Sequence, residues 1–363
     1  MFTRLRQTLR RKTRRPYRLL QIEPSLECTL DCVMCPWSEL RPQEATMSWD
    51  TFLRIAPNLS LAESVDFTGG GEPLKNPRLL KMVEIAKQAG CEVGFSTNGM
   101  RLYPEVSRQL LDLGLDWISF SVDAASAGLY ESIRRGGRYQ DVIGNITAMR
   151  DLKESRGSRT PRMLMVFVMM IGEQANYFEL PAFVQLAHRL GVEQVIAKNL
   201  DVILKDGDDE RRFFSHEGEP AVEIEDALEE ARRSAQDLGL GLRVYNMRPQ
   251  EVTVCEHNPL QNVFFNWEGI ISPCITLSYA ENRVFDGQRV LAPCQRFGDI
   301  HSETLPDVWN KPAYREFRKY YEARLASDRQ ASLDLLLGGP AEAEYTLPPA
   351  PEGCQTCYYL YGV

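Results

Sequence analysis

The feature that most limits the fold of this chain is an alternation of two kinds of segment between residue 18 and about residue 200. Short β-branched and apolar runs, typical of buried strands, alternate with longer segments whose apolar residues recur every three or four positions, as on a helix face. We expect strands at 19–23, 64–68, 92–96, 117–122, 163–170 and 194–197, and helices at 49–56, 77–89, 104–113, 139–154 and 177–190. This repeat predicts a parallel sheet covered by helices.

The length of the alternating region decides between a closed and an open barrel. A closed eight-fold barrel takes about 250 residues, whereas only about 220 precede a change in the character of the sequence. A polar segment follows Asp206, one more helix is expected at 221–238, and the sequence from about residue 245 is irregular and rich in Pro and Gly. We therefore predict an α/β fold, with a partial (β/α)6 TIM-like barrel over residues 18–240 and a small irregular domain over 241–363.

Charge separates the beginning of the chain from the rest. Residues 1–18 hold eight Lys and Arg and no acid, whereas residues 19–363 hold 34 basic and 50 acidic side chains, a net charge of −16. We treat residues 1–17 as a basic arm, which is either a tether to nucleic acid or a membrane surface, or a solvated leader. We expect the leader and no nucleic-acid partner, because only Phe2 and Tyr17 are aromatic side chains that can stack on bases.

Apolar segments bear on the compartment. The longest purely apolar run, residues 163–171, has nine residues, less than half of what a membrane-spanning helix needs. The basic arm is followed by Pro16 and Tyr17 rather than by the apolar stretch of a signal peptide. We therefore expect a cytoplasmic protein without a membrane partner, in which clustered cysteines are metal ligands rather than disulfides.

Three cysteines follow the first expected strand at the spacing Cys28-x3-Cys32-x2-Cys35. Three thiolates can bind three irons of a four-iron, four-sulfur cluster and leave the fourth iron open, whereas structural zinc and electron-transfer clusters generally use four protein ligands. An open iron implies that a substrate or cofactor binds at the metal. The alternatives are a zinc site with its fourth ligand elsewhere and a chance grouping.

Two polar segments follow the next two expected strands: TGGGEP at residues 68–73 and STNG at residues 96–99. Glycines let the backbone approach a ligand closely, and Glu72 offers a carboxylate to an ammonium group. A glycine run alone is more often a tight turn. However, the carboxyl ends of successive parallel strands meet at one edge, so three such loops in order predict one shared site.

Together these segments resemble the radical S-adenosylmethionine (radical SAM) superfamily. The resemblance covers roughly residues 18–235 and includes the cysteine triad, GGGEP, STNG and ISFSVDA on the fourth expected strand. It implies that Cys28, Cys32 and Cys35 hold a 4Fe-4S cluster whose open iron chelates S-adenosylmethionine (SAM). The implied SAM contacts are Gly70, Gly71 and Glu72 at the ammonium, Ser121 and either Arg134 or Arg135 at the carboxylate, Asn98 near the ribose, and Ile171 and Ala197 at the adenine, with Ser96 and Asp123 in the same segments.

Four cysteines near the C-terminus can form a second site. Four thiolates ligate either a cluster without an open iron or a zinc ion in a four-cysteine ribbon. The segments FFNWEGIISPC, RFGDIHSETLPDVWN and CQTC resemble the SPASM or shorter twitch extension of radical SAM enzymes. That resemblance implies one auxiliary 4Fe-4S cluster, held by Cys255, Cys274, Cys354 and Cys357.

Two cysteines remain outside both groups. Cys91 precedes an expected strand and is interpreted as a small buried residue. Cys294 lies within the auxiliary segment and is surplus to its four ligands. It is a hydrogen-atom donor to a substrate radical, a replacement ligand, or only a loop thiol.

Three functions are compatible with these motifs. The first is a radical SAM oxidoreductase or epimerase whose 5′-deoxyadenosyl radical abstracts hydrogen from an unactivated C–H of a small molecule such as a sugar or aminocyclitol. The second is radical epimerisation, cross-linking or oxidation of a peptide or protein. The third, a non-catalytic metal protein that binds nucleic acid through its arm, has no use for an open iron. Peptide-modifying members of the superfamily commonly carry an N-terminal domain that recognises a leader peptide. We expect the first function, because only 27 residues precede the cysteine loop. Either enzyme needs a low-potential electron donor such as flavodoxin or ferredoxin.

Overall fold

The structure is a computed structural model that describes residues 15–42, 44–214, 221–279, 281–337 and 346–363. Most of the basic arm, residues 1–14, lies outside the described residues, so the expectation of a solvated leader stays a prediction. In the described part of the chain, no helix combines the length and the apolar character that a bilayer crossing requires.

A ten-stranded sheet forms the centre of the molecule, in the order β14-β11-β10-β1-β3-β4-β5-β7-β8-β9. All neighbouring strands from β10 to β9 are parallel, whereas β11 pairs antiparallel with β10 and with β14. The strands are β1 (Tyr17–Ile22), β3 (Ala62–Asp66), β4 (Glu92–Thr97), β5 (Trp117–Ser121), β7 (Arg162–Val168), β8 (Gln194–Lys198), β9 (Gly241–Val244), β10 (Asn262–Phe265), β11 (Ile270–Ser272) and β14 (Gly298–Asp299).

The six expected strands occur as β1, β3, β4, β5, β7 and β8, but the sheet extends further at both edges. Strand β9 adds to β8, and β10, from the C-terminal region, pairs in parallel with β1. The sheet therefore continues past residue 240, where we placed a domain boundary. Strand β10 has the sequence NVFF and is buried on both faces, so it lacks the alternation that marks a half-exposed strand.

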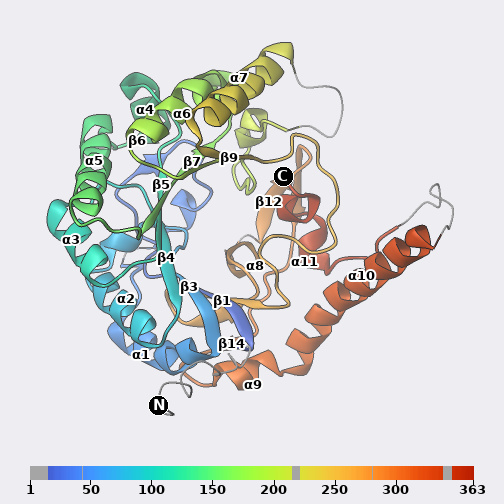
Figure 1. Ribbon diagram of the computed structural model, residues 1–363. Helices are drawn as coiled ribbons and strands as arrows, with labels where there is room; N and C mark the ends of the chain where they lie inside the picture. Colours follow the sequence, from blue (N-terminus) through green and yellow to red (C-terminus); the bar gives the residue numbers. More distant parts are fainter. Residues whose placement is uncertain (1–14, 43, 215–220, 280, 338–345) are drawn as a thin grey trace, which may run out of the picture.

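Helices cover the outer face of the parallel strands and form a partial ring that is open on one side (Figure 1). Helix α2 shows why: its buried residues Leu79, Met82, Val83 and Ala86 recur every three or four positions, so one face packs against the sheet. Helix α4, only seven residues long, was not expected. The helices of this layer are α1 (Trp49–Ile55), α2 (Leu79–Gln88), α3 (Pro104–Asp112), α4 (Ala127–Ile133), α5 (Tyr139–Ser155), α6 (Leu180–Arg189) and α7 (Val222–Leu238).

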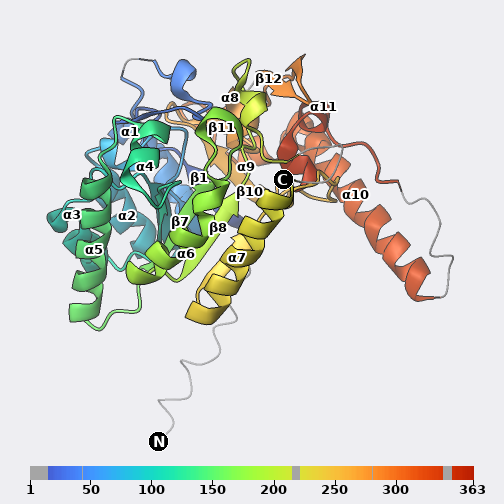
Figure 2. The same cartoon turned by 90° about the horizontal axis from the view of Figure 1, so that it is seen from above.

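The C-terminal region occupies the open side of this ring (Figure 1). We expected irregular structure here, yet α10 has 25 residues. Its buried residues end at Arg324, and the second half of the helix projects from the body of the protein (Figure 2). The sequence therefore lacks one apolar face along the full helix. The elements of this region are α8 (Ile275–Tyr279), β12 (Asn282–Phe285), β13 (Gln288–Leu291), α9 (Leu305–Trp309), α10 (Pro312–Leu336) and α11 (Glu352–Gln355).

Candidate active site

A cavity of about 350 Å³ lies where the parallel strands of the barrel end. Its wall combines the cysteine loop after β1 with the segments that follow β3, β4, β5 and β8, and His257, Ile275 and Tyr359 of the C-terminal region complete it. The sequence-predicted site residues that line this cavity are Cys28, Cys32, Cys35, Gly70, Gly71, Glu72, Ser96, Asn98, Ser121 and Arg134. The loops that follow successive strands therefore meet at one place, as parallel strands require.

Four residues that we expected to contact SAM do not line the cavity. The side chain of Arg135 is exposed, so Arg134 is the arginine of the pair that faces inward. Ala197 is fully buried in the hydrophobic core, and Ile171 packs against that core. The carboxylate of Asp123 is also buried; it accepts a hydrogen bond from Val168 N and pairs with Arg134 Nη2 at 2.5 Å. Asp123 thus holds the guanidinium of Arg134, which lines the cavity.

Each sulfur of the triad has a nitrogen donor in the cavity wall. Arg41 Nη2 donates to Cys35 Sγ at 3.1 Å, and Asn98 Nδ2 donates to Cys28 Sγ at 3.6 Å. Arg134 Nη1 donates to Cys32 Sγ at 3.8 Å, because the short strands β2 (Asp31–Cys32) and β6 (Arg134–Arg135) pair antiparallel.

Electrostatics and donor chemistry suit a thiolate-bound metal group. Burial raises the pKa of the Cys28 thiol and raises that of Cys32 to about 12. A bound metal deprotonates a coordinating thiol outright, and N–H donors then stabilise the thiolate charge. The residues present therefore fit a cluster held by these three sulfurs.

The described residues contain no group of three or more His, Cys, Asp or Glu side chains arranged to hold one metal ion. Thiols that each bind a different iron of a cluster do not have to converge on one point.

Glu72 ties two of the predicted segments together. Its buried carboxylate accepts hydrogen bonds from Thr97 Oγ1 and Asn98 N, both at 2.8 Å, and from Leu74 N at 3.1 Å. A carboxylate has about four acceptor positions, so one remains for a ligand. Burial raises the pKa of Glu72, and a neighbouring cationic ligand favours its ionised form.

The glycine run is also required for packing within the protein, whereas we explained it from the sequence only by the close approach of a ligand. A Cβ on Gly71 would lie 2.4 Å from the carbonyl oxygen of Glu27 and from the carbonyl carbon of Leu26. The segment can therefore pass beneath the cysteine loop only with glycine at this position.

The four C-terminal cysteines lie together in the second expected site. The pKa of Cys255 is raised to about 12, mainly by burial and secondly by the neighbouring thiols. The same two causes raise the pKa of Cys274. Each of these two thiols interacts with Cys357, and Cys274 also interacts with Cys354. The hydroxyl of Tyr321, on α10, lies beside the thiols of Cys255 and Cys354 and lowers the pKa of both. The donor set fits a fully ligated cluster.

Cys294 lies in the loop between β13 and β14, where the carbonyl of the preceding Pro293 faces Gly353, next to Cys354. It does not line the cavity, and the charged groups that influence its pKa are Arg296, Glu281 and Arg283. The structure therefore does not place it where a hydrogen-atom donor would reach a substrate carbon in the cavity.

Sequence reasoning missed one wall of the cavity. Lys198 and Asp201 form an ion pair there, and Lys198 Nζ donates to Tyr359 Oη at 3.4 Å. Asn199 Oδ1 and His257 Nε2 are buried in this wall without a hydrogen-bond partner among the described residues. No local motif marks these residues, because they come from the turn after β8 and from two distant C-terminal segments.

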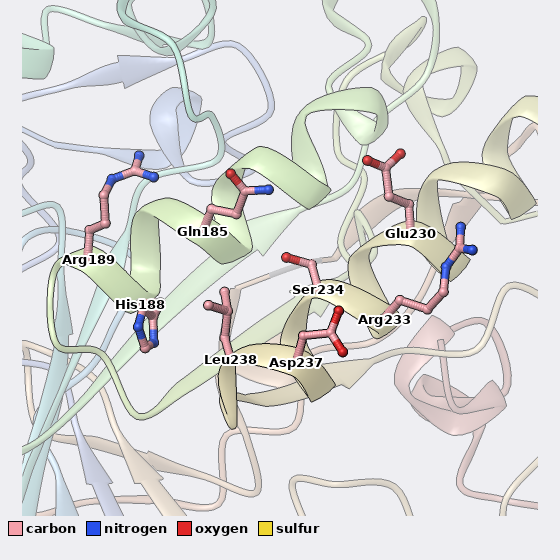
Figure 3. A pocket seen from close by; sticks show the side chains of 8 residues that line it. All are labelled: Gln185, His188, Arg189, Glu230, Arg233, Ser234, Asp237 and Leu238. Atoms are coloured by element: carbon pink, nitrogen blue, oxygen red, sulfur yellow. The ribbon is translucent and has the colours of Figure 1, made fainter.

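A second hollow lies between α6 and α7 (Figure 3). Its lining includes Gln185, Arg189, Glu230 and Arg233, and none of the sequence-predicted site residues.

Two family profiles match the chain. The Radical SAM superfamily matches residues 22–187, and SPASM, described as an iron-sulfur cluster-binding domain, matches residues 255–333. The chain is a radical SAM protein with a SPASM domain. Its cofactors are therefore SAM, a 4Fe-4S cluster and auxiliary iron–sulfur clusters. When they are bound, the reduced cluster and SAM supply a carbon radical that can remove a hydrogen atom from a substrate carbon.

Relatives of the radical SAM protein include a tungsten-containing aldehyde ferredoxin oxidoreductase cofactor-modifying protein of Pyrococcus furiosus, 25% identical over 82% of each chain. An AdoMet-dependent heme synthase of Methanosarcina barkeri is 30% identical over 37% of this chain, which spans only 39% of that relative. SuiB of Streptococcus suis bound to SAM has a TM-score of 0.62 at 14% identity, covering 83% of this chain and 68% of SuiB. The expected partial-barrel fold is confirmed.

Proposed function

We propose that this radical SAM protein modifies a carbon–hydrogen position of a peptide or protein, by epimerisation, cross-linking or oxidation. The observation that carries the proposal is the fold shared with SuiB, whose structure with the precursor peptide SuiA has a TM-score of 0.59 at 13% identity and covers 95% of this chain and 70% of SuiB. This favours the peptide alternative over the small molecule that we expected from the sequence.

The small size of the cavity supports a long substrate, of which only one part enters the cavity. Its volume of about 350 Å³ lies near the lower end of the roughly 300–1,000 Å³ of small-ligand sites. Because the cluster and SAM are assigned to this same cavity, only the reacting part of a peptide would enter it and the rest would lie outside. The target carbon would then sit between the cysteine triad and the wall of Lys198, His257 and Tyr359.

The proposal assigns the residues of the SAM site as follows. The triad binds the cluster, Glu72 with the glycine segment receives the ammonium of SAM, and Ser121 with Arg134 holds its carboxylate. The protein residues themselves bind and orient the reactants and exclude water from the cavity. The external reductant is a low-potential carrier such as flavodoxin or ferredoxin.

A second candidate is the modification of a cofactor or another small molecule. The Pyrococcus furiosus relative favours it, because its name describes a cofactor-modifying protein and the match covers 82% of both chains.

One experiment separates the two candidates. The anaerobically reconstituted protein is reduced with dithionite in the presence of SAM. Formation of 5′-deoxyadenosine is then measured after addition of an extract of the source cells, divided into peptide and low-molecular-mass fractions. A peptide substrate predicts stimulation that protease treatment of the extract abolishes. Stimulation that resists protease and remains in the low-molecular-mass fraction contradicts the peptide proposal and supports the second candidate.

The reaction type has its own readout once a substrate fraction is found. Epimerisation predicts incorporation of deuterium from heavy water into the product, without a change in its composition. Oxidation or cross-linking predicts the loss of two hydrogens without that incorporation.

A further inference from the structure

Glu23 is a buried carboxylate that none of the roles assigned above uses. It follows β1 directly and has no exposed surface. Glu23 Oε1 accepts a hydrogen bond from Gly70 N at 2.7 Å, and Glu23 Oε2 accepts from Trp267 N at 3.2 Å and from the hydroxyl of Tyr279. Burial raises the pKa of this carboxyl, and the three donors favour its ionised form.

The three donors come from two separate parts of the molecule. Gly70 belongs to the segment that lines the SAM cavity. Trp267 lies between β10 and β11, and Tyr279 ends α8, so both belong to the SPASM region. The backbone repeats the connection, because Glu23 N donates to the carbonyl oxygen of Phe265 at 2.9 Å. Glu23 is therefore bonded to both regions at once.

The side chain of Glu23 also shapes the glycine segment. A Cβ on Gly69 would lie 2.2 Å from Glu23 Cγ, so glycine is required there to make room for the carboxylate. The peptide group between Gly69 and Gly70 is planar, so its carbonyl points away from Glu23 when its N–H points toward it. Both glycines line the cavity. The orientation of the Gly69–Gly70 peptide group is therefore fixed by Glu23, which does not itself line the cavity.

We infer that Glu23 is a positioning residue that couples the SPASM region to SAM binding: Tyr279 and Trp267 fix its carboxylate, which in turn fixes the Gly69–Gly70 peptide in the cavity. The inference rests on the part of the proposed function that places SAM in this cavity, and it is independent of the substrate.

A double-mutant cycle tests this coupling on the full, anaerobically reconstituted chain. Glu23→Gln, Tyr279→Phe and the double variant are compared by equilibrium dialysis of SAM. Glu23→Gln turns an amide NH2 toward one of the donors, so we expect it to weaken SAM binding about tenfold, and Tyr279→Phe to weaken it about threefold. Because Tyr279 acts through Glu23, the double variant is expected to bind no more weakly than Glu23→Gln alone.

A matched control separates positioning from general damage. Tyr314 is a fully buried tyrosine of the C-terminal region, and its hydroxyl has no hydrogen-bond partner among the described residues. Tyr314→Phe is expected to bind SAM like the parent. Iron content and urea unfolding are measured for every variant, and if Glu23→Gln does not fold, Tyr279→Phe carries the test.

The outcomes separate this inference from the proposed function. It is overturned if iron-loaded Glu23→Gln or Tyr279→Phe binds SAM as tightly as the parent, or if the two effects multiply in the double variant. A parent that holds its iron but does not bind SAM overturns the proposed function as well. A SAM-dependent change in the electron paramagnetic resonance spectrum of the reduced parent, diminished in Glu23→Gln, gives an independent readout.

Discussion

Individual side chains around the triad are expected to set the potential of the first cluster. Arg41 donates to Cys35 Sγ at 3.1 Å and to the carbonyl oxygen of Leu30 at 2.9 Å, so it also braces the cysteine loop. Hydrogen bonds to cluster sulfurs and nearby positive charge stabilise the more negative, reduced state. Arg41 should therefore raise the reduction potential.

Replacing Arg41 tests this effect. We expect Arg41→Gln to lower the midpoint potential of the triad cluster by about 30–60 mV, the equivalent of roughly a three- to tenfold change in its one-electron reduction equilibrium. A redox titration followed by electron paramagnetic resonance measures the shift. Arg54→Gln is the control, because Arg54 forms only an exposed ion pair with Asp50. An unchanged potential in an iron-loaded Arg41→Gln protein would rule out this role.

Asp66 should make stability depend on pH. Desolvation raises the pKa of its carboxyl to about 7, above the value of about 4 in an unfolded chain. The stabilisation from this group is therefore fully present below about pH 4 and is lost as the pH rises through about 7. Asp66→Asn removes this titration, so the variant should gain stability relative to the parent over that interval. Urea unfolding at several pH values measures it; a pH-independent difference would contradict the prediction.

The cysteine triad, Glu72 and Asn98 could be predicted from the sequence because each lies in a segment that follows a strand. Cys28, Glu72 and Asn98 meet because parallel strands bring their following loops to one edge. The choice between Arg134 and Arg135 depended on the pairing of β2 with β6, which no local pattern encodes. Glu23 and the Lys198 wall were missed for the same reason, since their partners lie far away along the chain.

Among the elements, the glycine segment after β3 is the most constrained by its neighbours. A Cβ on Gly71 would meet backbone atoms of the cysteine loop, which cannot yield as a flexible side chain can. We expect Gly71→Ala to lose about 1–3 kcal/mol of unfolding free energy and to retain less iron at the triad.

Gly144→Ala is the matched control for that substitution. Gly144 lies within α5, and an added Cβ would meet nothing within 4 Å. The variant should gain about 0.5–1 kcal/mol, because alanine restricts the unfolded chain and favours the helix. Urea unfolding and iron analysis measure both variants. Equal stability and iron content in Gly71→Ala and the parent would contradict the packing argument.

The elements that could be predicted from the sequence are those in which apolar residues recur at a regular spacing over the full length of the element. The six central strands and their amphipathic helices have this spacing, and helix α7 appears as Val222–Leu238 against the expected 221–238. Helix α10 was missed because only its first half contacts the core. Strands β10 and β11 are short, and their place in the sheet depends on pairing with β1 rather than on their own sequence.

At the scale of the molecule, the ten-stranded sheet is organised around β1, which separates the barrel strands from the C-terminal strands (Figure 1). Strand β3 pairs with one side of β1 and β10 with the other. The cavity consequently takes its wall from both the barrel and the SPASM region. This arrangement favours substrate binding between the two cysteine groups.

Iron counting tests the assignment of cysteines to two clusters. The parent is expected to hold about eight irons per chain and Cys274→Ala about four, because removal of one of four ligands disrupts the auxiliary cluster. Cys294→Ala is the matched variant and should keep about eight, since Cys255, Cys274, Cys354 and Cys357 already supply the four ligands of the auxiliary cluster. Iron loss in Cys294→Ala would instead make it a replacement ligand.

Cleavage of SAM by the reduced protein is the most direct test that the triad holds a cluster with an open iron. The anaerobically reconstituted parent, treated with dithionite and SAM, should form 5′-deoxyadenosine, whereas Cys32→Ala should form none. An iron-loaded parent that forms no 5′-deoxyadenosine, or a protein that binds zinc in place of iron at the triad, would contradict the assignment.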